Sequence, residues 1–344
     1  MSAVVVVGAG IVGSSVAYHL ARRGVPVTLI ERGPAPAAGV TGASFAWIGG
    51  AGGHWPGGAR DLREYVLADY RRLEGELPHV TVRRCGSLSP AHRTGTHGRR
   101  RVSSASDDVT SRRWSPTSGA RPSKPSTSRA TRGVDPTALA RTLVTAAADH
   151  GATALHDTAV TSLRVTGGRV DGVLTSTGPH AAGTVVLTAG TDIPELCEPL
   201  SADLPVVASP AAVARVAAPP GLVRTVVASP AFEVREVRDG ELLLGLPHAE
   251  GRAALDRAAR DTLQRLKAAF RGSGQCRLLG YRTGRRPMPA HGPVIGYATD
   301  DRSVYVAVMH SAVTLAPTAG RLVADELVTG RPAPELRHCR PRTR

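Results

Sequence analysis

The sequence predicts an α/β fold in two parts, and three observations predict it. Residues 4–32 hold a strand–turn–helix–strand unit, and residues 303–330 return to a strand followed by a helix. Residues 205–247 are instead short apolar runs divided by Pro and Gly, as in an antiparallel sheet. We therefore expect the first part to be assembled from distant stretches of the chain, with the second part inserted between them.

The opening unit is the most regular stretch in the sequence. Four consecutive valines, Val4–Val7, form the pattern of a buried strand. Residues 11–23 then place apolar side chains at helical spacing, and Val25–Ile30 forms a second apolar run that ends on Glu31. This order predicts a βαβ unit.

Gly8, Gly10 and Gly13 join the first strand to the helix with the G-x-G-x-x-G spacing of a Rossmann-like dinucleotide site. Gly8 permits a tight turn, Gly10 lets backbone approach a diphosphate, and Gly13 lets the helix pack closely on the strand. The start of that helix, at Ile11 and Val12, presents unpaired N–H groups to the phosphates. Glu31 stands where an acid accepts hydrogen bonds from a ribose.

Further elements follow the same patterns. Asp135 and Pro136 are typical of a helix start, and the pair Gly167-Gly168 indicates a hairpin turn. We expect helices over 59–77, 136–149, 251–270 and 314–329, strands within 153–190, and a strand over 304–309.

Two C-terminal stretches carry a resemblance to a known family. Residues 284–296 read GRRPMPAHGPVIG, and residues 303–330 read SVYVAVMHSAVTLAPTAGRLVADELVTG. With the N-terminal unit, they resemble the FAD-dependent amino-acid oxidase family, which includes D-amino-acid oxidase, glycine oxidase and monomeric sarcosine oxidase. The resemblance covers residues 1–80 and 134–335. It implies a discontinuous Rossmann-like FAD-binding domain (1–80, 134–200 and 284–344) and an inserted, mostly antiparallel α+β substrate domain (81–133 and 201–283).

The resemblance also implies which residues hold the cofactor. Val160 would present its backbone to the adenine, Ala189 and Gly190 would allow close approach, and Arg32 would flank the adenine. The helix start after His310 would point at the flavin, although Ala312 stands where the family often has Gly. The expected FAD-binding residues are Gly8, Gly10, Ile11, Val12, Gly13, Glu31, Arg32, Ser44, Val160, Ala189, Gly190, Ser311, Ala312 and Thr314. The cysteine positions do not match the covalent-flavin motif of sarcosine oxidases, so we expect non-covalent FAD.

Three residues are expected to serve the substrate. A guanidinium binds a carboxylate through two parallel hydrogen bonds, and in the resembled family the Arg of an Arg-Pro pair has this role. Here the pair is Arg286-Pro287. His310 would add charge near the flavin, and Tyr281 would line the substrate side. The implied reaction oxidises the C–N bond of an amino acid or secondary amine to an imine by hydride transfer to flavin N5. O2 or another acceptor would then reoxidise the flavin.

Residues 89–132 break the pattern. They are rich in Arg, Ser, Thr, Pro and Gly, with few apolar residues and neither a period of 2 nor of 3.6. Such a segment cannot offset its ordering entropy by burial, so we expect it to be irregular or disordered. One interpretation is a basic insert. The favoured one is a stretch read out of frame in GC-rich DNA, because long structureless loops are uncommon inside compact domains. The chain would then be an impaired oxidoreductase with a corrupted substrate wall.

Composition narrows the other possibilities. The formal net charge is +15, but residues 83–132 hold 12 Lys and Arg against 2 Asp and Glu, a net of +10 that leaves +5 for the rest. A basic polyanion-binding protein is therefore the weaker alternative, and we expect no specific nucleic-acid partner. No metal-ligand spacing, apolar membrane span or signal sequence is visible, so we expect no metal and a cytoplasmic location. The sequence leaves the substrate and the oligomeric state open.

Overall fold

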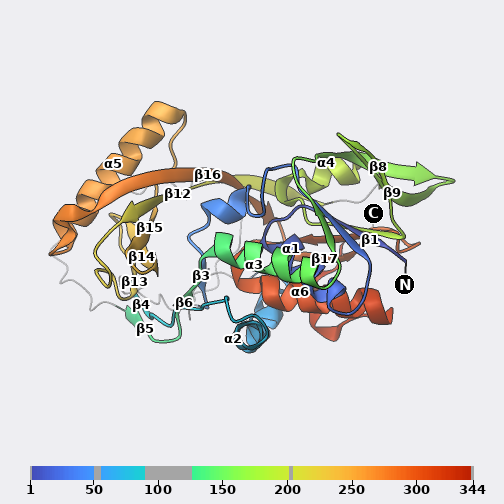
Figure 1. Cartoon of the computed structure of the whole chain (residues 1–344), viewed down its shortest axis with the longest axis horizontal. Helices are drawn as coiled ribbons and strands as arrows, with labels where there is room; N and C mark the ends of the chain where they lie inside the picture. The colour runs from blue at the N-terminus through green and yellow to red at the C-terminus, as the bar shows by residue number, and fades with distance from the viewer. Residues whose placement is uncertain (1, 50–55, 90–125, 201–203, 342–344) are drawn as a thin grey trace, which may run out of the picture.

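The computed structural model describes residues 2–49, 56–89, 126–200 and 204–341. The two larger sheets follow one another along the long axis of the molecule, one in each half (Figure 1). Two long strands, β12 (Val206–Ala217) and β16 (Arg277–Pro289), run from one half toward the other.

The first sheet has six strands and is parallel except at one edge. Val4–Val7 forms its centre, with β2 on one side and β11 on the other, and β17 pairs antiparallel with β18 at the edge. In spatial order the strands are β17 (Val294–Tyr297), β18 (Val304–Val308), β11 (Thr184–Leu187), β1 (Val4–Val7), β2 (Val27–Ile30) and β7 (Thr153–Leu155).

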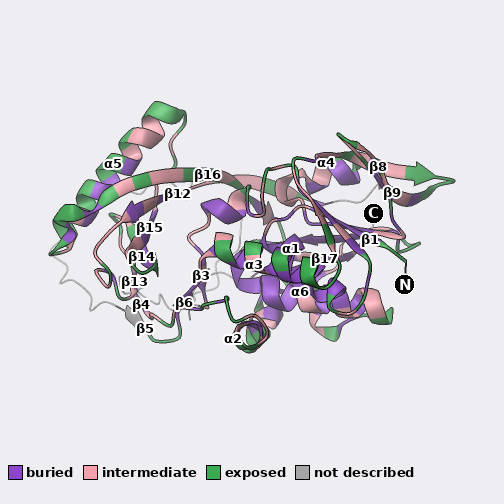
Figure 2. Ribbon diagram, viewed as in Figure 1, coloured by how far each residue is buried: buried purple, intermediate pink, exposed green. Residues whose placement is uncertain are grey.

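Both faces of this sheet are covered, as the consecutive valines predict. Val4 and Val6 belong to the core shared with helices α1 (Ile11–Ala21), α3 (Pro136–Asp149) and α6 (Ala312–Thr329). Val5 and Val7 face the opposite core, beneath α4 (Ile193–Cys197) and a three-stranded sheet. Figure 2 shows β1 and α1 as buried. The three strands are β8 (Val160–Thr166), β9 (Arg169–Thr175) and β10 (Gly178–Ala181).

The second sheet has seven strands and is antiparallel except where β13 pairs with β4. Helix α5 (Arg252–Ala269) packs on one of its faces through Leu263 and Leu266. In spatial order the strands are β16, β12, β15 (Glu241–Gly245), β14 (Glu233–Arg238), β13 (Val226–Ala228), β4 (Ser87–Ser89) and β5 (Ser126–Ser128).

The remaining elements are short. Strands β3 (Trp47–Ile48) and β6 (Arg132–Gly133) pair with each other, and helix α2 (Ala59–Glu76) packs against α6. The 3₁₀ turns are η1 (Val40–Ala43), η2 (Gly190–Asp192), η3 (Glu198–Leu200), η4 (Ser273–Gln275) and η5 (Pro334–Cys339). Among the helices of the described residues, none combines the length and apolar content needed to cross a bilayer.

The structure confirms the α/β fold class and most expected elements. The Asp135 carboxylate accepts hydrogen bonds from the Thr137 and Ala138 N–H groups and so caps α3. The proposed domain division stays a prediction; β16 crosses its boundary at residue 284.

The segment 89–132 needs a partial correction. Residues 90–125 lie outside the described residues. The irregular structure expected up to residue 132 is wrong at the far end, because Ser126–Ser128 pairs with β4 and Arg132–Gly133 pairs with β3. Backbone hydrogen bonding to a neighbouring strand overrides the weak local pattern there.

Candidate active site

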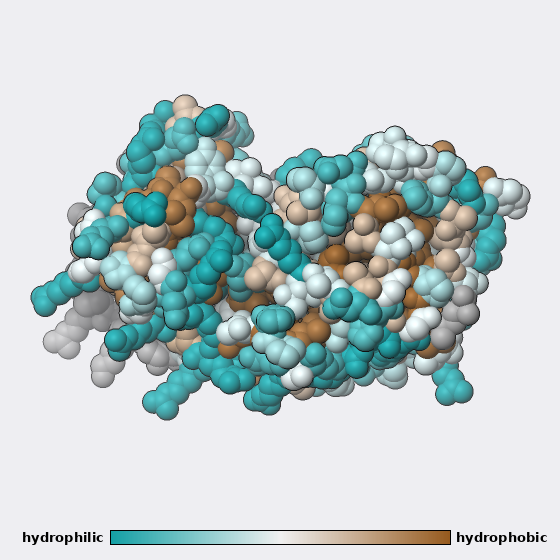
Figure 3. All heavy atoms as spheres, viewed as in Figure 1, coloured by the Kyte–Doolittle hydropathy of each residue, from teal (hydrophilic) through white to brown (hydrophobic). Residues whose placement is uncertain are grey.

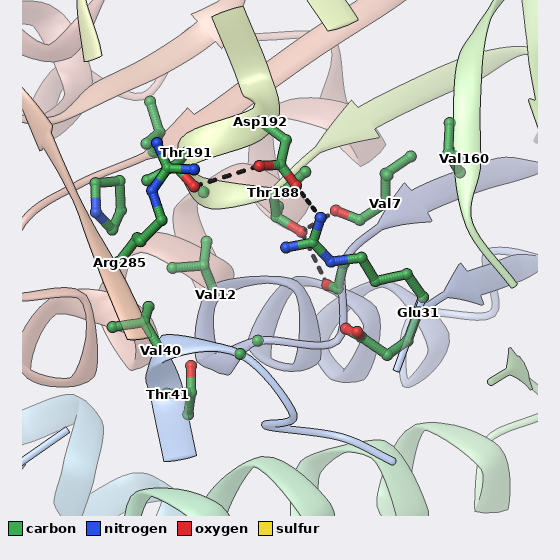
Figure 4. A pocket seen from close by; sticks show the side chains of 18 of the residues that line it. Val7, Val12, Glu31, Val40, Thr41, Val160, Thr188, Thr191, Asp192 and Arg285 are labelled. Atoms are coloured by element: carbon green, nitrogen blue, oxygen red, sulfur yellow. Dashed lines mark hydrogen bonds and ion pairs between the residues drawn. The ribbon is translucent and has the colours of Figure 1, made fainter. Parts of the chain in front are cut away.

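A cavity of about 780 Å³ opens where β1 and β2 end and α1 begins (Figure 4). Its lining includes Glu31, Val160, Met309 and Ala312. Figure 3 shows apolar side chains recessed among hydrophilic ones on this half of the molecule. The volume lies within the range of small-molecule and cofactor sites.

The glycines fit a cavity built for close backbone approach. Gly8 has φ +99°, a conformation that favours glycine, and a Cβ there would lie 3.1 Å from the Thr188 carbonyl oxygen. A Cβ on Gly13 would overlap the Gly8 carbonyl oxygen and the Thr188 hydroxyl. That hydroxyl donates to the carbonyl oxygens of Val7 and Gly8, at 2.7 and 3.0 Å, and so fixes the turn. Gly13 therefore shapes the cavity from behind rather than lining it.

The first turn of α1 faces the cavity through Ile11 and Val12. Gly10 is the N-cap and provides no side-chain cap. Thr41 of η1 supplies one instead, because its hydroxyl accepts a hydrogen bond from the Ile11 N–H at 3.0 Å. The remaining first-turn N–H groups have no partner within the helix, which is the arrangement that binds phosphate.

Glu31 is 92 % buried at the end of β2, where its carboxylate closes the turn. Its Oε2 accepts from the Ala9 N–H at 2.7 Å and its Oε1 from the Gly33 N–H at 2.8 Å. Each carboxylate oxygen keeps a lone pair for a ribose hydroxyl. The Arg32 guanidinium forms an ion pair with the Asp192 carboxylate at 2.6 Å, and both residues line the cavity.

The structure therefore brings ten of the expected cofactor residues into one lining. These are Gly8, Gly10, Ile11, Val12, Glu31, Arg32, Val160, Ala189, Gly190 and Ala312. Their binding of a cofactor remains a prediction.

Besides Gly13, three expected residues lie outside that lining, each for a local reason. The Ser44 hydroxyl accepts from the Ala46 N–H at 3.1 Å. The Thr314 hydroxyl is buried and donates to the Trp47 carbonyl oxygen at 3.0 Å, so it ties α6 to β3. Ser311 is the N-cap of α6 in a left-handed conformation, φ +60°, and turns the chain between β18 and the helix.

The second sheet presents one face, here called the inner face, toward the loop that carries Phe45. Directly paired residues point to the same side of a sheet. Between β16 and β12, Arg286 pairs with Ser209 and Arg282 pairs with Val213. On β15, Gly245 pairs with Val213 of β12 on one side and with Glu233 of β14 on the other. Phe45 packs on Val213, Val237 and Leu243 of this face. Arg282, Arg286 and Glu233 therefore share one face.

Arg286 has no acidic partner among the residues that the structure describes, and two polar neighbours hold its side chain. The Nη2 of Arg286 donates to the Ser209 hydroxyl at 2.9 Å and to the Pro210 carbonyl oxygen at 3.0 Å. Since a guanidinium has five donors, Nε and Nη1 are left for a ligand. Arg286 is exposed, and it is not among the residues that line the FAD-sized cavity.

Glu233 lies on the same inner face, where the positive charge of Arg286 acts on its carboxyl group. Desolvation raises the pKa of Glu233, and the positive charge of Arg286 opposes that rise. Its Oε2 lies over β15, 3.4 Å from where a Cβ on Gly245 would stand. The two residues do not form an ion pair with each other.

The junction between β18 and α6 borders the cavity and contains His310. Met309 and Ala312 line the cavity, and His310 lies between them in the sequence. The positive charge of Arg286 acts on His310. Desolvation, and then Arg286, lower the pKa of His310. Both effects disfavour the charged form of His310, so its expected role as an added positive charge stays a prediction that this environment does not favour.

Tyr281 is the expected site residue that the structure places elsewhere. It pairs with Ala214, whose side chain belongs to the core beneath α5. Its hydroxyl donates to the Asp256 carboxylate of α5 at 2.8 Å. Side chains alternate along a strand, so Tyr281 and Arg286, five residues apart on β16, face opposite sides. The expected substrate role of Tyr281 stays a prediction, and the structure places this residue on the face of β16 opposite to Arg286.

Several lining residues were missed by the sequence analysis. Thr41, Thr188 and Arg285 matter most, since two of them fix the glycine turn and helix start and the third is a cation in the cavity. The only signal for Thr188 was its place before Ala189-Gly190 at a strand end. Thr41 and Arg285 gave none that separates them from their neighbours.

No metal or thiol chemistry is assembled around the cavity. Within the described ranges, no three His, Cys, Asp or Glu side chains are grouped as metal ligands. None of the four cysteines lines the cavity, and three of them are buried. The donor set fits a dinucleotide held by backbone and charge.

Comparison with known proteins agrees with this geometry. The family model described as "FAD dependent oxidoreductase" matches residues 3–326. The chain is 29 % identical to the uncharacterized oxidoreductase YurR of Bacillus subtilis, over 96 % of each chain. It is 34 % identical to a D-amino acid dehydrogenase of Cereibacter sphaeroides, over 53 % of this chain and 43 % of that protein.

Among solved structures, glycine oxidase from Geobacillus kaustophilus superposes with a TM-score of 0.78. The match covers 100 % of this chain and 99 % of that one at 18 % identity, and so reports the shared fold. The family match spans the glycine turn, the cavity and the junction at His310. The chain belongs to the FAD dependent oxidoreductase family, and FAD is the cofactor that its cavity is built to hold without a covalent bond.

Proposed function

We propose that this protein oxidises the C–N bond of an amino acid or secondary amine that carries a carboxylate. The observation that carries the proposal is that β16 borders the FAD cavity through Arg285 and Pro287 and, between them, holds Arg286 on the inner face of the second sheet. When bound, FAD supplies an acceptor at flavin N5 for the hydride that leaves the substrate α-carbon.

Arg286 is the carboxylate-binding residue in this proposal. Ser209 and Pro210 hold one nitrogen of its guanidinium, so the remaining donors point away from those two contacts in a fixed orientation. A bidentate pair would orient the α-carbon and its nitrogen. The relatives named as D-amino acid dehydrogenases and the neighbour named as glycine oxidase act, by those names, on amino acids, which supports this choice.

Glu233 is the anionic partner for the substrate nitrogen. It shares the inner face with Arg286, yet no ion pair joins the two, so each keeps its charge for a ligand. Because its pKa is raised, Glu233 is also suited to take the proton from a substrate ammonium. This leaves the neutral amine, whose α-carbon then loses the hydride. The product imine would then hydrolyse to a carbonyl compound and an amine.

The experiment is an anaerobic half-reaction. Mixing the holoenzyme with a panel of amino acids and N-alkyl glycines should bleach the oxidised-flavin absorbance for at least one of them, and O2 or an artificial acceptor should restore it. Arg286→Ala should raise KM for that compound and lower kcat/KM about tenfold to a hundredfold with FAD content unchanged. A flavoprotein that no amine bleaches, but that a hydroxy acid does, would overturn the proposal.

A further inference from the structure

Arg285 and Arg286 are adjacent, and β16 directs them to different surroundings. Alternate residues of the strand, Thr283, Arg285 and Pro287, line the FAD cavity, whereas Arg286 pairs with Ser209 on the inner face. The strand lies against η1 and η2, and a Cβ on Gly284 would lie 2.7 Å from the Cα of Val40. This close packing fixes where the Arg285 side chain enters the cavity.

The charges around the cavity leave Arg285 without a protein partner. The lining contains three acidic residues, Glu31, Asp192 and Glu195, and two arginines. Arg32 is paired with Asp192. Across the described ranges, no carboxylate, carbonyl or hydroxyl accepts a hydrogen bond from the Arg285 guanidinium.

The position of Arg285 selects one part of the cofactor. Figure 4 shows Arg285 entering the cavity from β16, near Val40 and near Val12 in the first turn of α1, with its guanidinium directed toward Thr191. That turn offers N–H groups to phosphate, but neither those groups nor Thr41 carries a full positive charge. A diphosphate brings two negative charges into a lining with three acidic residues, and the Arg285 guanidinium would offset them beside the first turn of α1.

We propose that Arg285 binds the diphosphate of FAD and that the Arg285-Arg286 pair divides its work, the first residue for the cofactor and the second for the substrate. The part that concerns Arg285 depends only on FAD binding. The part that concerns Arg286 rests on the proposed function, and the two parts fail separately.

The test compares Arg285→Gln with Arg286→Gln, two neutralised neighbours on one strand. Dialysis of each holoenzyme against graded FAD, and separately against riboflavin, gives dissociation constants for both. Arg285→Gln should weaken FAD binding about tenfold to a hundredfold and leave riboflavin binding unchanged, because riboflavin has no phosphate. The loss should shrink at high salt, as screening weakens the contact in the wild-type protein. Arg286→Gln should keep wild-type affinity for both.

Other outcomes decide against the proposal. If Arg285→Gln weakened the binding of FAD and of riboflavin equally, Arg285 would contact the flavin ring and not the diphosphate. If its affinity for FAD were unchanged, Arg285 would not contact the cofactor. Should Arg285→Gln not fold, Arg285→Lys keeps the charge and should retain FAD with an intermediate affinity; wild-type or wholly lost affinity in the Lys variant would overturn the contact. Acetate, followed by its perturbation of the flavin spectrum, should bind Arg285→Gln but not Arg286→Gln. Acetate binding to both would contradict only the role of Arg286.

Discussion

Arg235 lies over the ring of Phe45, with its guanidinium carbon 5.6 Å from the ring centroid and its Nε donating to the Phe45 carbonyl oxygen at 2.6 Å. Its Nη2 donates to the Val134 carbonyl oxygen, also at 2.6 Å. Arg235 is 99 % buried, and desolvation lowers its pKa to about 10. One buried side chain of β14 thus joins the second sheet to the loop before β3 and to the start of α3.

Replacing Arg235 with Met should destabilise the protein strongly. Two carbonyl oxygens would lose their donors, at about 1–3 kcal/mol each, so the free energy of unfolding should fall by roughly 2–6 kcal/mol. Denaturant unfolding measures this. Arg238→Met, on the same strand but 62 % exposed, is the control and should cost about 1 kcal/mol or less. If the free energy of unfolding fell no further in Arg235→Met than in Arg238→Met, the contacts of Arg235 with Phe45 and Val134 would not stabilise the fold.

Gly13→Ala should remove FAD from the protein. Its Cβ would overlap the Gly8 carbonyl oxygen, which is backbone and cannot move without opening the glycine turn. We expect little flavin in the purified variant and a destabilisation of about 1–3 kcal/mol. Gly75→Ala is the matched control: it lies on the exposed side of α2 with open space around it and should gain about 0.5–1 kcal/mol. Normal flavin content in Gly13→Ala would contradict this account.

His19 should make the protein acid-sensitive. It is 99 % buried on α1, and neither ring nitrogen has a hydrogen-bond partner in the described structure. Burial, followed by Arg72 and Arg23, holds its pKa well below 6.5. Below pH 6.5 the unfolded chain therefore takes up a proton that the folded chain does not, so stability should fall by about 1.4 kcal/mol per pH unit.

The measurement is the free energy of unfolding between pH 7.5 and 5. His19→Leu should flatten that dependence, whereas His248→Gln, at an exposed position, should leave it unchanged. The same slope in the wild type and in His19→Leu would assign the acid sensitivity to other groups.

Glu233→Gln tests the second half of the proposed substrate site. The variant should bind an amino acid such as alanine about tenfold more weakly while binding propionate, which lacks the amine, as well as the wild type does. Flavin difference spectra report both without turnover. Should the wild-type protein bind propionate as tightly as alanine, Glu233 has no part in recognising the amine.

The predictable part of this protein is the part encoded locally. The strand, glycines and helix of residues 4–30, the Asp135 cap and the Gly167-Gly168 hairpin each depend on neighbours in sequence, and each appears in the structure. The side of β16 on which a residue lies is different, because it is set by pairing with β12 about 75 residues earlier. That is why the face on which Tyr281 lies could not be predicted and Arg285 was overlooked.

Burial of a charged residue was equally hidden from the sequence. Arg235 stands in the run Glu-Val-Arg-Glu-Val-Arg of residues 233–238, where four of six residues are charged and nothing marks one of them as buried. Only the contact of the inner face with Phe45 and Val134 makes it a core residue. Such contacts join segments of the chain 101 and 190 residues apart.

The central position of β1 sets the order in which the molecule can be completed during synthesis. One edge of Val4–Val7 is covered by β2 almost at once, but the other waits for Thr184–Leu187, and β11 in turn waits for Val304–Val308. A growing chain therefore carries an open, valine-rich edge until Thr184–Leu187 has been synthesised, a state prone to wrong pairing. FAD capture needs Met309 and Ala312, which follow β18, so the cofactor meets a chain in which every strand of the first sheet has already been synthesised.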